Sequence, residues 1–450
     1  MAANKQKNTE ATRLPREFVD LLKSPFVRFL RIDAAGAAIL LLFTLAALVL
    51  SNSPWANSFE HFWEIQAVFQ VGSFKLARSL REWINDGLMV LFFFLVALEL
   101  KRELVLGELN KPRVAALSIA AALGGMIVPA TIYLALQFGQ PGQDGWGTVM
   151  ATDTVFVIGC LAILGSRAPK SLRVFMLSLA IVDDIGAILV IAIGYSSHSI
   201  DWWPLVWAVL GLAIIRAMSK IGFRGFPLYI FMGVIIWLAV DASGLHAAIT
   251  GVVLGLMTPA RRWVSNKRLY AILGQVIAHP TRTESSGVTK DRHTLQMAEI
   301  AARETLSPAE RLVILLHPWV GFVIMPLFAF ANAGLSLSLT ELDGSVTLAV
   351  FLGFVLGKPV GILLFSWLAI RFHIAIHPPG LNWRLLAGGS LLAGIGFTLA
   401  LFIANIAFDK DLIDSVKVGI FLASIFSATA GLTILFLMVA PRENPKEERE

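Results

Sequence analysis

The chain has 450 residues, of which 56% are hydrophobic and 15% are charged, and its mean hydropathy is +0.73. This composition excludes an ordinary soluble globular protein. Apolar runs of roughly eighteen residues or more recur along the whole length, which is typical of a polytopic helical membrane protein. The net charge of +6 does not indicate a nucleic-acid partner, because Lys and Arg gather in loops on one predicted side of a lipid bilayer and no nucleic-acid-binding motif is present.

The apolar runs predict an all-α integral membrane fold of twelve transmembrane helices. Loops rich in Lys and Arg alternate with loops that are poor in them, so the positive-inside rule places both termini in the cytoplasm. A cytoplasmic N-terminal segment, 1–31, is expected before the transmembrane domain 32–440, and a cytoplasmic tail, 441–450, after it. The predicted spans are about 35–52, 84–100, 114–137, 147–165, 171–195, 203–218, 226–240, 244–258, 312–335, 347–370, 384–406 and 416–440.

Two connecting segments are unusual. Residues 62–80 alternate polar and apolar side chains around Gly72-Ser73, which fits a small external β-hairpin, and an amphipathic connector fits equally well. Residues 261–311 are long and polar, so we expect a flexible cytoplasmic loop without chemistry of its own.

The order of the spans suggests an internal repeat. Three spans within about 114–195 start from the cytoplasmic side, and three within about 347–440 start from outside. Equal groups of opposite orientation are typical of inverted repeats in secondary transporters, where the substrate site lies between the repeats. Each group has a middle span rich in glycine or threonine, at 147–154 and 388–398, and both are expected to be helices broken at mid-membrane. Close packing through small residues would explain the same glycines.

Four ionisable residues lie in the middle of apolar spans: Asp153, Asp183, Asp184 and Lys358. Each would cost at least about 2–3 kcal/mol there unless it is paired or hydrated, so such residues usually mark an ion or proton path. Lys358 should have a carboxylate partner, and Asp183 and Asp184 are nearest to it in depth. Consecutive helical residues point about 100° apart, so one aspartate can pair while the other faces an ion path. A permanent structural salt bridge is the alternative.

These carboxylates predict ion exchange. Hard cations such as Na⁺ and Li⁺ take oxygen ligands, and one aspartate that holds either a cation or a proton is sufficient to exchange them. We expect Asp153, preceded by Thr152, where two broken helices cross. There it would neutralise the positive N-terminal ends of the half-helices, while Lys358 would do the converse at their C-terminal ends.

The motifs resemble those of bacterial Na⁺/H⁺ antiporters of the NhaA type, and the resemblance covers most of residues 20–440. It is carried by ATD at 151–153, LAIVDDIGA at 179–187 and GKPVGI at 357–362, with WIND at 83–86, LELKRE at 98–103, HPW at 317–319 and FAFANAG at 328–334.

The resemblance implies a bacterial inner-membrane protein of twelve helices with two crossed discontinuous helices. It implies electrogenic exchange in which more protons enter than Na⁺ leaves, and a homodimer joined partly through the 53–83 hairpin. The expected role is sodium and pH homeostasis, with Na⁺ or Li⁺ and protons as transported ions, no cofactor and no enzymatic activity.

Residue roles are implied in the same way. Asp184 is expected to be the Na⁺ ligand and proton carrier, and Asp183 to be a second Na⁺ ligand that also pairs with Lys358. Thr152 with Asp153 is expected to form the crossing that supports the ion-binding site, and a direct ligand role for Asp153 stays open. The residues expected in the pH response are Glu99, Arg102, Glu103, Asp86 and His246, although a plain surface salt bridge would also explain the first three.

The chain also departs from the family pattern. Val313 and Ile314 stand where a Glu and a His of the pH-sensing region are expected, so the pH profile should differ. Among other functions, a cation-coupled symporter would need groups that bind an organic solute, and none is evident. A buried Asp–Lys pair suits alternating access better than a channel, and an ATP-driven pump would need a phosphate-binding G-x-x-x-x-G-K-[ST] loop, which the sequence lacks. A structural or signalling subunit would leave the mid-membrane aspartates unexplained.

Overall fold

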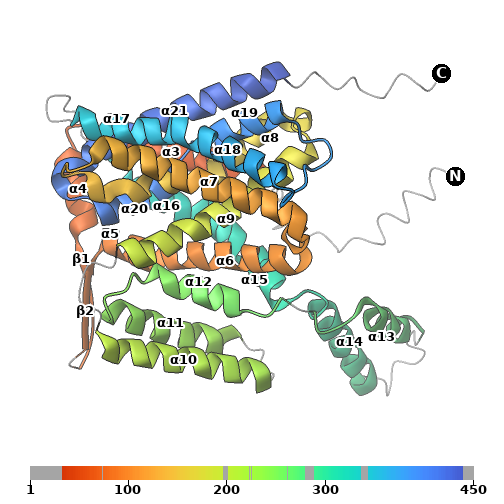
Figure 1. The fold of residues 1–450 in the computed structure, drawn as a ribbon. Helices are drawn as coiled ribbons and strands as arrows, with labels where there is room; N and C mark the ends of the chain where they lie inside the picture. Colours follow the sequence, from red (N-terminus) through yellow and green to blue (C-terminus); the bar gives the residue numbers. More distant parts are fainter. Residues whose placement is uncertain are drawn as a thin grey trace, which may run out of the picture.

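A computed structural model describes residues 33–438, apart from residues 73, 196–200, 222, 224–225, 261, 279–287 and 336–342. The segments expected at 1–31 and 441–450 therefore lie outside the described residues. Most long helices run side by side along one direction (Figure 1). The pair formed by α13 (Asn266–Ala278) and α14 (Val288–Arg303) stands away from them at one end.

Within the described residues, nine helices are long and apolar enough to cross a membrane, or ten if one bent pair counts as a span. Two shorter helices are also apolar, α11 (Phe226–Ala242) and α12 (Ala248–Met257). The helices of the first half are α3 (Asp33–Ser51), α4 (Ala56–Glu64), α5 (Leu80–Glu82), the π-helix η1 (Trp83–Leu88), α6 (Met89–Leu106), η2 (Glu108–Asn110), α7 (Pro112–Gln137), η3 (Gln143–Met150), α8 (Thr154–Leu164), η4 (Gly165–Arg167), α9 (Lys170–Gly194) and α10 (Trp202–Ile221). Those after α14 are α15 (Pro308–Trp319), η5 (Val320–Ile324), α16 (Met325–Asn332), α17 (Gly344–Leu352), η6 (Gly353–Gly357), α18 (Lys358–Arg371), α19 (Trp383–Leu392), α20 (Phe397–Ala407) and α21 (Lys410–Met438).

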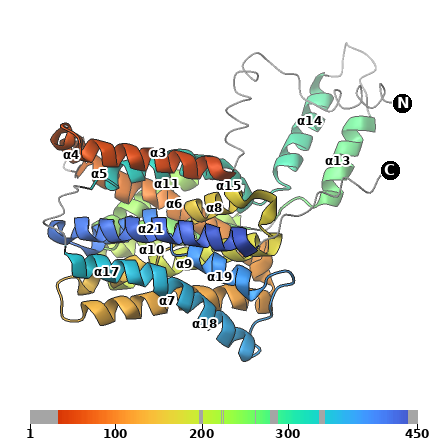
Figure 2. The ribbon, with the colours of Figure 1, turned by 90° about the horizontal axis from the view of Figure 1, so that it is seen from above.

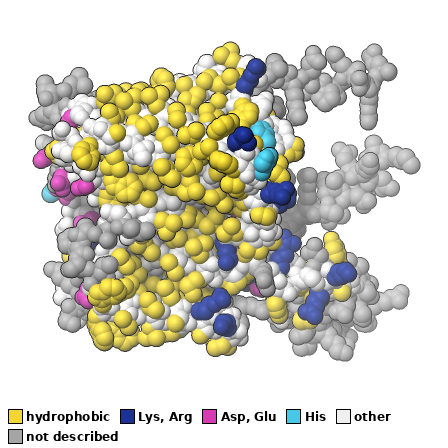
Figure 3. Space-filling model, viewed as in Figure 1, with side chains coloured by type: hydrophobic (Ala, Val, Ile, Leu, Met, Phe, Trp, Pro, Cys, Tyr) yellow, Lys and Arg dark blue, Asp and Glu magenta, His cyan; other side chains and the backbone are white. Residues whose placement is uncertain are grey.

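The helix bundle has an apolar outer surface, and its two ends carry opposite charge. Large side chains such as Trp203, Val206 and Leu210 on α10 are exposed, as expected where a helix faces lipid instead of water. Figure 3 shows the hydrophobic surface bounded by Asp and Glu at one end and by Lys and Arg at the other. We call these the acidic end, where α17 begins, and the basic end, where α18 finishes at Arg371. The basic end corresponds to the predicted cytoplasmic side.

Two helices of the bundle approach each other backbone to backbone. Helices α7 and α18 lie side by side in both ribbon views (Figures 1 and 2). A Cβ atom added to Gly124 would lie 2.2 Å from the carbonyl oxygen of Gly361, and one added to Gly361 would lie 2.0 Å from that of Gly124. The two glycines therefore permit this contact, which holds the helix that begins at Lys358 against its neighbour.

The segment 62–80 contains two paired strands. Strand β1 (Gln66–Val71) runs antiparallel to β2 (Phe74–Ser79), with Gln66 opposite Ser79. The side chain of Ser79 accepts the N–H of Glu82, and the side chain of Glu82 accepts the N–H of Ser79, so a capping box starts the helical turn that leads into η1.

The expectation of a flexible loop over 261–311 was wrong for most of the described part. Helices α13 and α14 pack against each other there, and α15 begins at Pro308 after a capping box between Ser307 and Glu310. The prediction rested on the polar composition and overlooked apolar residues at helical spacing in α13, which are Leu269, Ile272 and Leu273. Residues 279–287 lie outside the described residues.

Candidate functional site

Two interrupted helices meet in the interior. Residues 151–153 separate η3 from α8, and residues 393–396 separate α19 from α20, where the axis bends by 48°. The N–H of Asp153 donates to the carbonyl of Ile395 at 2.6 Å, and the hydroxyl of Thr152 donates to the carbonyl of Ala393 at 2.9 Å. Each break thus satisfies backbone groups that the other leaves unpaired, which makes irregular backbone tolerable at this depth.

Asp153 receives hydrogen bonds at the start of two half-helices. Its Oδ1 accepts the N–H groups of Val155 and Phe156 at the start of α8, both at 3.1 Å. Its Oδ2 accepts the N–H of Thr398 at 2.9 Å and the hydroxyl of Thr398 at 2.5 Å, at the start of α20. The side chain is buried. Because a helix N-terminus carries partial positive charge, one carboxylate here stabilises both half-helices.

Lys358 is fully buried and its ammonium uses three acceptors. It donates to Asp183 Oδ2 at 2.5 Å, to Thr152 Oγ1 at 2.7 Å and to the carbonyl of Met150 at the end of η3. An ammonium has three N–H groups, so all are satisfied. The structure therefore joins Lys358 to Asp183, as the family resemblance implied, and not to Asp184; depth in the membrane alone left that choice open.

Asp184 is buried, and no basic side chain of the described residues forms a salt bridge with it. Its Oδ2 accepts the hydroxyl of Thr154 at 3.2 Å. Its Oδ1, like Oδ1 of Asp183, receives no hydrogen bond from the part of the chain that the structure describes. A buried carboxylate oxygen without a donor is costly, and a proton or a hard cation would remove that cost.

The residues expected in the pH response lie at two ends of α6. At the basic end, Arg102 Nη2 lies 3.3 Å from Glu103 Oε1, one turn from Glu99. A cavity of about 340 Å³ between α6 and α9 is lined there by Glu103, Lys111, Ser178 and Ile181, together with Leu106, Gly107, Val174 and Leu177. Ile181 precedes Asp184 by one turn, so this cavity approaches the aspartates from the basic end.

Asp86 and His246 lie far from that group. Asp86 is about 20 Å from Glu99 along the helix direction. It accepts a hydrogen bond from Arg78 of β2, which also bonds Asp241 at 2.5 Å. His246, in the loop between α11 and α12, has Nε2 3.9 Å from Asp86 Oδ1. Burial, assisted by the charge of Arg78, lowers the pKa of His246 to about 4, which leaves the ring neutral near pH 7.

Several polar contacts of this site were not singled out from the sequence. Thr154 is the first residue of α8 and Thr398 the second residue of α20, each next to a break, and that position is the one signal that could have found them. Arg78 and Asp241 belong to segments that sequence analysis treated as connectors. Val313 is buried and Ile314 is exposed on α15, so neither brings a titratable group to the interior.

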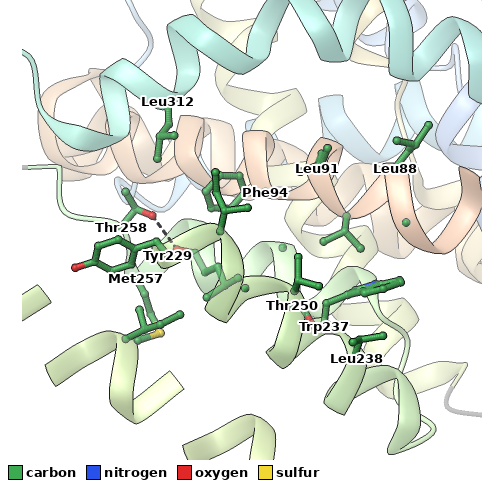
Figure 4. Close-up of a pocket in the computed structure, with 18 of the residues that line it drawn as sticks. Leu88, Leu91, Phe94, Tyr229, Trp237, Leu238, Thr250, Met257, Thr258 and Leu312 are labelled. Carbon is green, nitrogen blue, oxygen red and sulfur yellow. Dashed lines mark hydrogen bonds between the residues drawn. The ribbon is translucent and has the colours of Figure 1, made fainter. Parts of the chain in front are cut away.

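A second cavity contains none of the predicted site residues. It measures about 1340 Å³, and Glu304 and Arg311 are its charged lining residues. Figure 4 shows its wall of mainly apolar side chains from several helices: Leu88 of η1, Leu91 and Phe94 of α6, Tyr229, Trp237 and Leu238 of α11, Thr250 and Met257 of α12, and Leu312 of α15. Such a wall offers a small cation few ligands, so the aspartate cluster is the better candidate site.

Comparison with known proteins identifies the family to which the chain belongs. The sequence profile of a family described as Na⁺/H⁺ antiporter 1 matches residues 27–435. The chain is 56% identical over 435 residues to Na(+)/H(+) antiporter NhaA 1 of Acidiphilium cryptum, with 97% of each chain covered. It is 56% identical to Na(+)/H(+) antiporter NhaA of Rhizobium meliloti, with 96% of this chain and 99% of the relative covered, and 50% identical to that of Rhodopirellula baltica, with 94% and 96% covered.

The chain belongs to the Na⁺/H⁺ antiporter 1 family. The resemblance to bacterial antiporters of the NhaA type is thereby confirmed. The apolar helices are those of an integral membrane protein of this family, and the motifs that carry the resemblance include the chain break at 151–153, the aspartate pair on α9 and the start of α18.

Proposed function

We propose that the protein is a secondary active, electrogenic antiporter that exports Na⁺ or Li⁺ in exchange for protons. It resides in the bacterial inner membrane with both termini in the cytoplasm and serves sodium and pH homeostasis. The observation that carries this proposal is the pair of buried neighbouring aspartates: Asp183 is joined to Lys358, Asp184 has no basic partner among the described residues, and each has one oxygen that receives no hydrogen bond from them. Membership of an antiporter family supports the same function.

Exchange follows from competition at Asp184. In its charged form the carboxylate binds Na⁺ or Li⁺, with the hydroxyl oxygen of Thr154 3.2 Å from its Oδ2 and with the neighbouring Asp183 as a second proposed oxygen ligand. A proton on Asp184 removes the charge that attracts the cation, so one ligand leaves as the other binds. If Asp183 also takes up a proton when the cation leaves, two protons enter per cation and the exchange moves charge.

The scaffold that we propose has twelve crossings in an inner-membrane fold. They are the nine long helices, the bent pair α19–α20, and the shorter α11 and α12. The two discontinuous helices cross where Thr152 and Asp153 contact the second break, within inverted repeats at 114–195 and 347–440. Alternating access moves these repeats relative to the other helices, and a homodimer forms partly through the 53–83 hairpin.

Glu99, Arg102 and Glu103 are proposed to control access in response to pH. Their place beside the cavity between α6 and α9 supports this role, since a change in their charge would alter the potential along the approach to Asp184. Asp86 and His246 are proposed to take part in the pH response at the acidic end of the bundle. The substitutions at Val313 and Ile314 should displace the pH profile from that of relatives with ionisable residues there.

The test uses everted membrane vesicles that contain the protein. A preformed pH gradient should collapse when Na⁺ or Li⁺ is added and should persist when K⁺ is added, over part of the range pH 6.5–9. Clamping the membrane potential at zero should change the rate, because electrogenic exchange responds to potential. Vesicles without the protein are the control. Persistence of the gradient after Na⁺ and Li⁺, with the protein verified in the membrane, would contradict antiport and favour a cation-coupled symporter.

A further inference from the structure

The two ends of the proposed moving interface are built differently. On one side of it lie the repeat helices, α7–α9 and α17–α21, and on the other the flanking helices, α3, η1, α6, α10–α12, α15 and α16. At the basic end these groups face each other across the 340 Å³ cavity between α6 and α9. At the acidic end, α20 contacts α16, and α16 contacts η1, through side chains that are described next.

Three asparagines from three helices form one hydrogen-bonded cluster, which we call the amide triad: Asn85 of η1, Asn332 of α16 and Asn405 of α20. Asn332 is buried, and its Oδ1 accepts from Asn405 at 3.1 Å and from Asn85 at 3.2 Å. Its Nδ2 donates to Asn85 Oδ1 at 2.8 Å and to the carbonyl of Phe328 at 2.9 Å. Asn405 is thus the triad member that belongs to the repeat helices.

The triad acts on the same helix that supports the ion site. On α20, Thr398 bonds Asp153, Phe402 packs against the His246 ring at 5.3 Å between centroids, and Asn405 bonds Asn332. These positions follow helical spacing, so they lie along one side of α20. Thr398 and Asn405 are about 10 Å apart along the helix. The helix that touches the crossing at one end is therefore held to the flanking helices at the other.

We propose that the amide triad is a latch that keeps the acidic, outward side of the ion site closed, and that Asn405 is the positioning residue through which α20 is released. This inference rests on the proposed antiport function and adds the contact that alternating access must break. Neutral amides suit that task, because water can replace each lost partner at small net cost. A buried ion pair or an aromatic contact of the same size would be harder to separate.

The test measures the outward-open population directly. Cys160 is first replaced by Ser, and Ala404→Cys places a reporter thiol on α20 beside the latch, where the side chain is buried. A membrane-impermeant maleimide is then applied from outside to intact cells. Asn405→Ala should raise the labelling rate several-fold. In everted vesicles it should also raise the apparent KM for Na⁺ at the cytoplasmic face, because less protein faces inward.

Asn52→Ala is the matched control. Asn52 also donates from its side chain at the acidic end, to the carbonyls of Leu48 and Leu335 at 2.8 Å each, but it joins α3 to the residues after α16, which are both on the flanking side. Its labelling rate should equal that of the parent. Asn85→Ala, which removes a contact between two flanking helices while Asn405 keeps Asn332, should raise the rate less than Asn405→Ala.

The outcomes separate a latch from ordinary structural support. Unchanged labelling and KM in Asn405→Ala would overturn the proposal, as would an equal rise in Asn52→Ala, and a lowered melting temperature without faster labelling would assign Asn405 a structural role only. Labelling does not require transport. Faster labelling in a protein that shows no Na⁺-driven proton movement would therefore keep the latch and reject the antiport function.

Discussion

The ammonium nitrogen of Lys358 lies 2.5 Å from a carboxylate oxygen of Asp183, and both side chains are buried. Removing one partner of a buried ion pair destabilises the fold, because the charge that remains is neither paired nor solvated by water. The pair therefore fixes α9 against α18 and leaves the neighbouring Asp184 as the carboxylate without a basic partner among the described residues.

Replacing Lys358 by Ala should destabilise the protein by about 3–5 kcal/mol, since it leaves Asp183 buried and unpaired. The melting temperature of the detergent-solubilised protein measures this loss. Adding Asp183→Asn should restore part of the stability, because the uncompensated charge is removed. Melting of Lys358→Ala at the wild-type temperature would show that the pair contributes nothing to the fold.

Thr398 should be needed for its hydroxyl and not for its size. Thr398→Val removes the O–H that Asp153 Oδ2 accepts at 2.5 Å and leaves the N–H bond in place. The free energy of unfolding should fall by about 1–3 kcal/mol, observed as a lower melting temperature, and Na⁺ should drive proton exchange more weakly. Thr398→Ser keeps the donor and should behave like wild type. Equal behaviour of the Val and Ser variants would contradict this account of the crossing.

Gly394 in the second break should not tolerate a methyl group. A Cβ there would lie 2.5 Å from Ser427 Oγ and 2.9 Å from the carbonyl oxygen of Phe354, and the latter is backbone that cannot turn away. Gly394→Ala should therefore lower both stability and transport by displacing the break from Thr152. Gly321→Ala, where a Cβ would meet nothing within 4 Å, is the control. Normal melting and exchange in Gly394→Ala would show that the break can shift without loss.

His246 should make the protein acid-sensitive. Its pKa of about 4 lies below the ordinary value of 6.5, so the folded state favours the neutral ring, whose Nδ1 accepts the N–H of Ala248 at 3.3 Å. This stability is fully present above about pH 6.5 and is lost as pH falls toward 4, to a limit of about 3 kcal/mol. Melting curves between pH 7 and 4.5 should show a smaller loss in His246→Gln than in wild type. Parallel losses would argue against a buried neutral histidine.

The sequence predicts the parts of the site that cost free energy in a membrane. Asp153, Asp183, Asp184 and Lys358 are conspicuous because they interrupt apolar runs, and both chain breaks follow from glycines and threonines. The family resemblance implied that Asp183 is the partner of Lys358. Depth in the membrane alone did not distinguish Asp183 from Asp184, because the rotation of α9 about its axis is not encoded by a helix that is apolar nearly all round.

Other contacts escaped prediction for a related reason. Asn85 and Asn332 are 247 positions apart, and Arg78 and Asp241 are 163 apart, and nothing local in either segment specifies the partner. The helices α13 and α14 were not predicted because their composition is polar. They stand outside the main bundle and have fewer apolar positions than a membrane span.

The central claim, that a proton and Na⁺ compete for Asp184, is tested most directly by proton release from the purified protein. Na⁺ is added to detergent-solubilised protein in weakly buffered solution with a pH indicator, and the same addition is made to Asp184→Asn and to Asp144→Asn, which alters an exposed aspartate on η3. The account predicts release of protons from wild type and Asp144→Asn, with choline giving none, and little or no release from Asp184→Asn. Release from Asp184→Asn equal to that of wild type would contradict it.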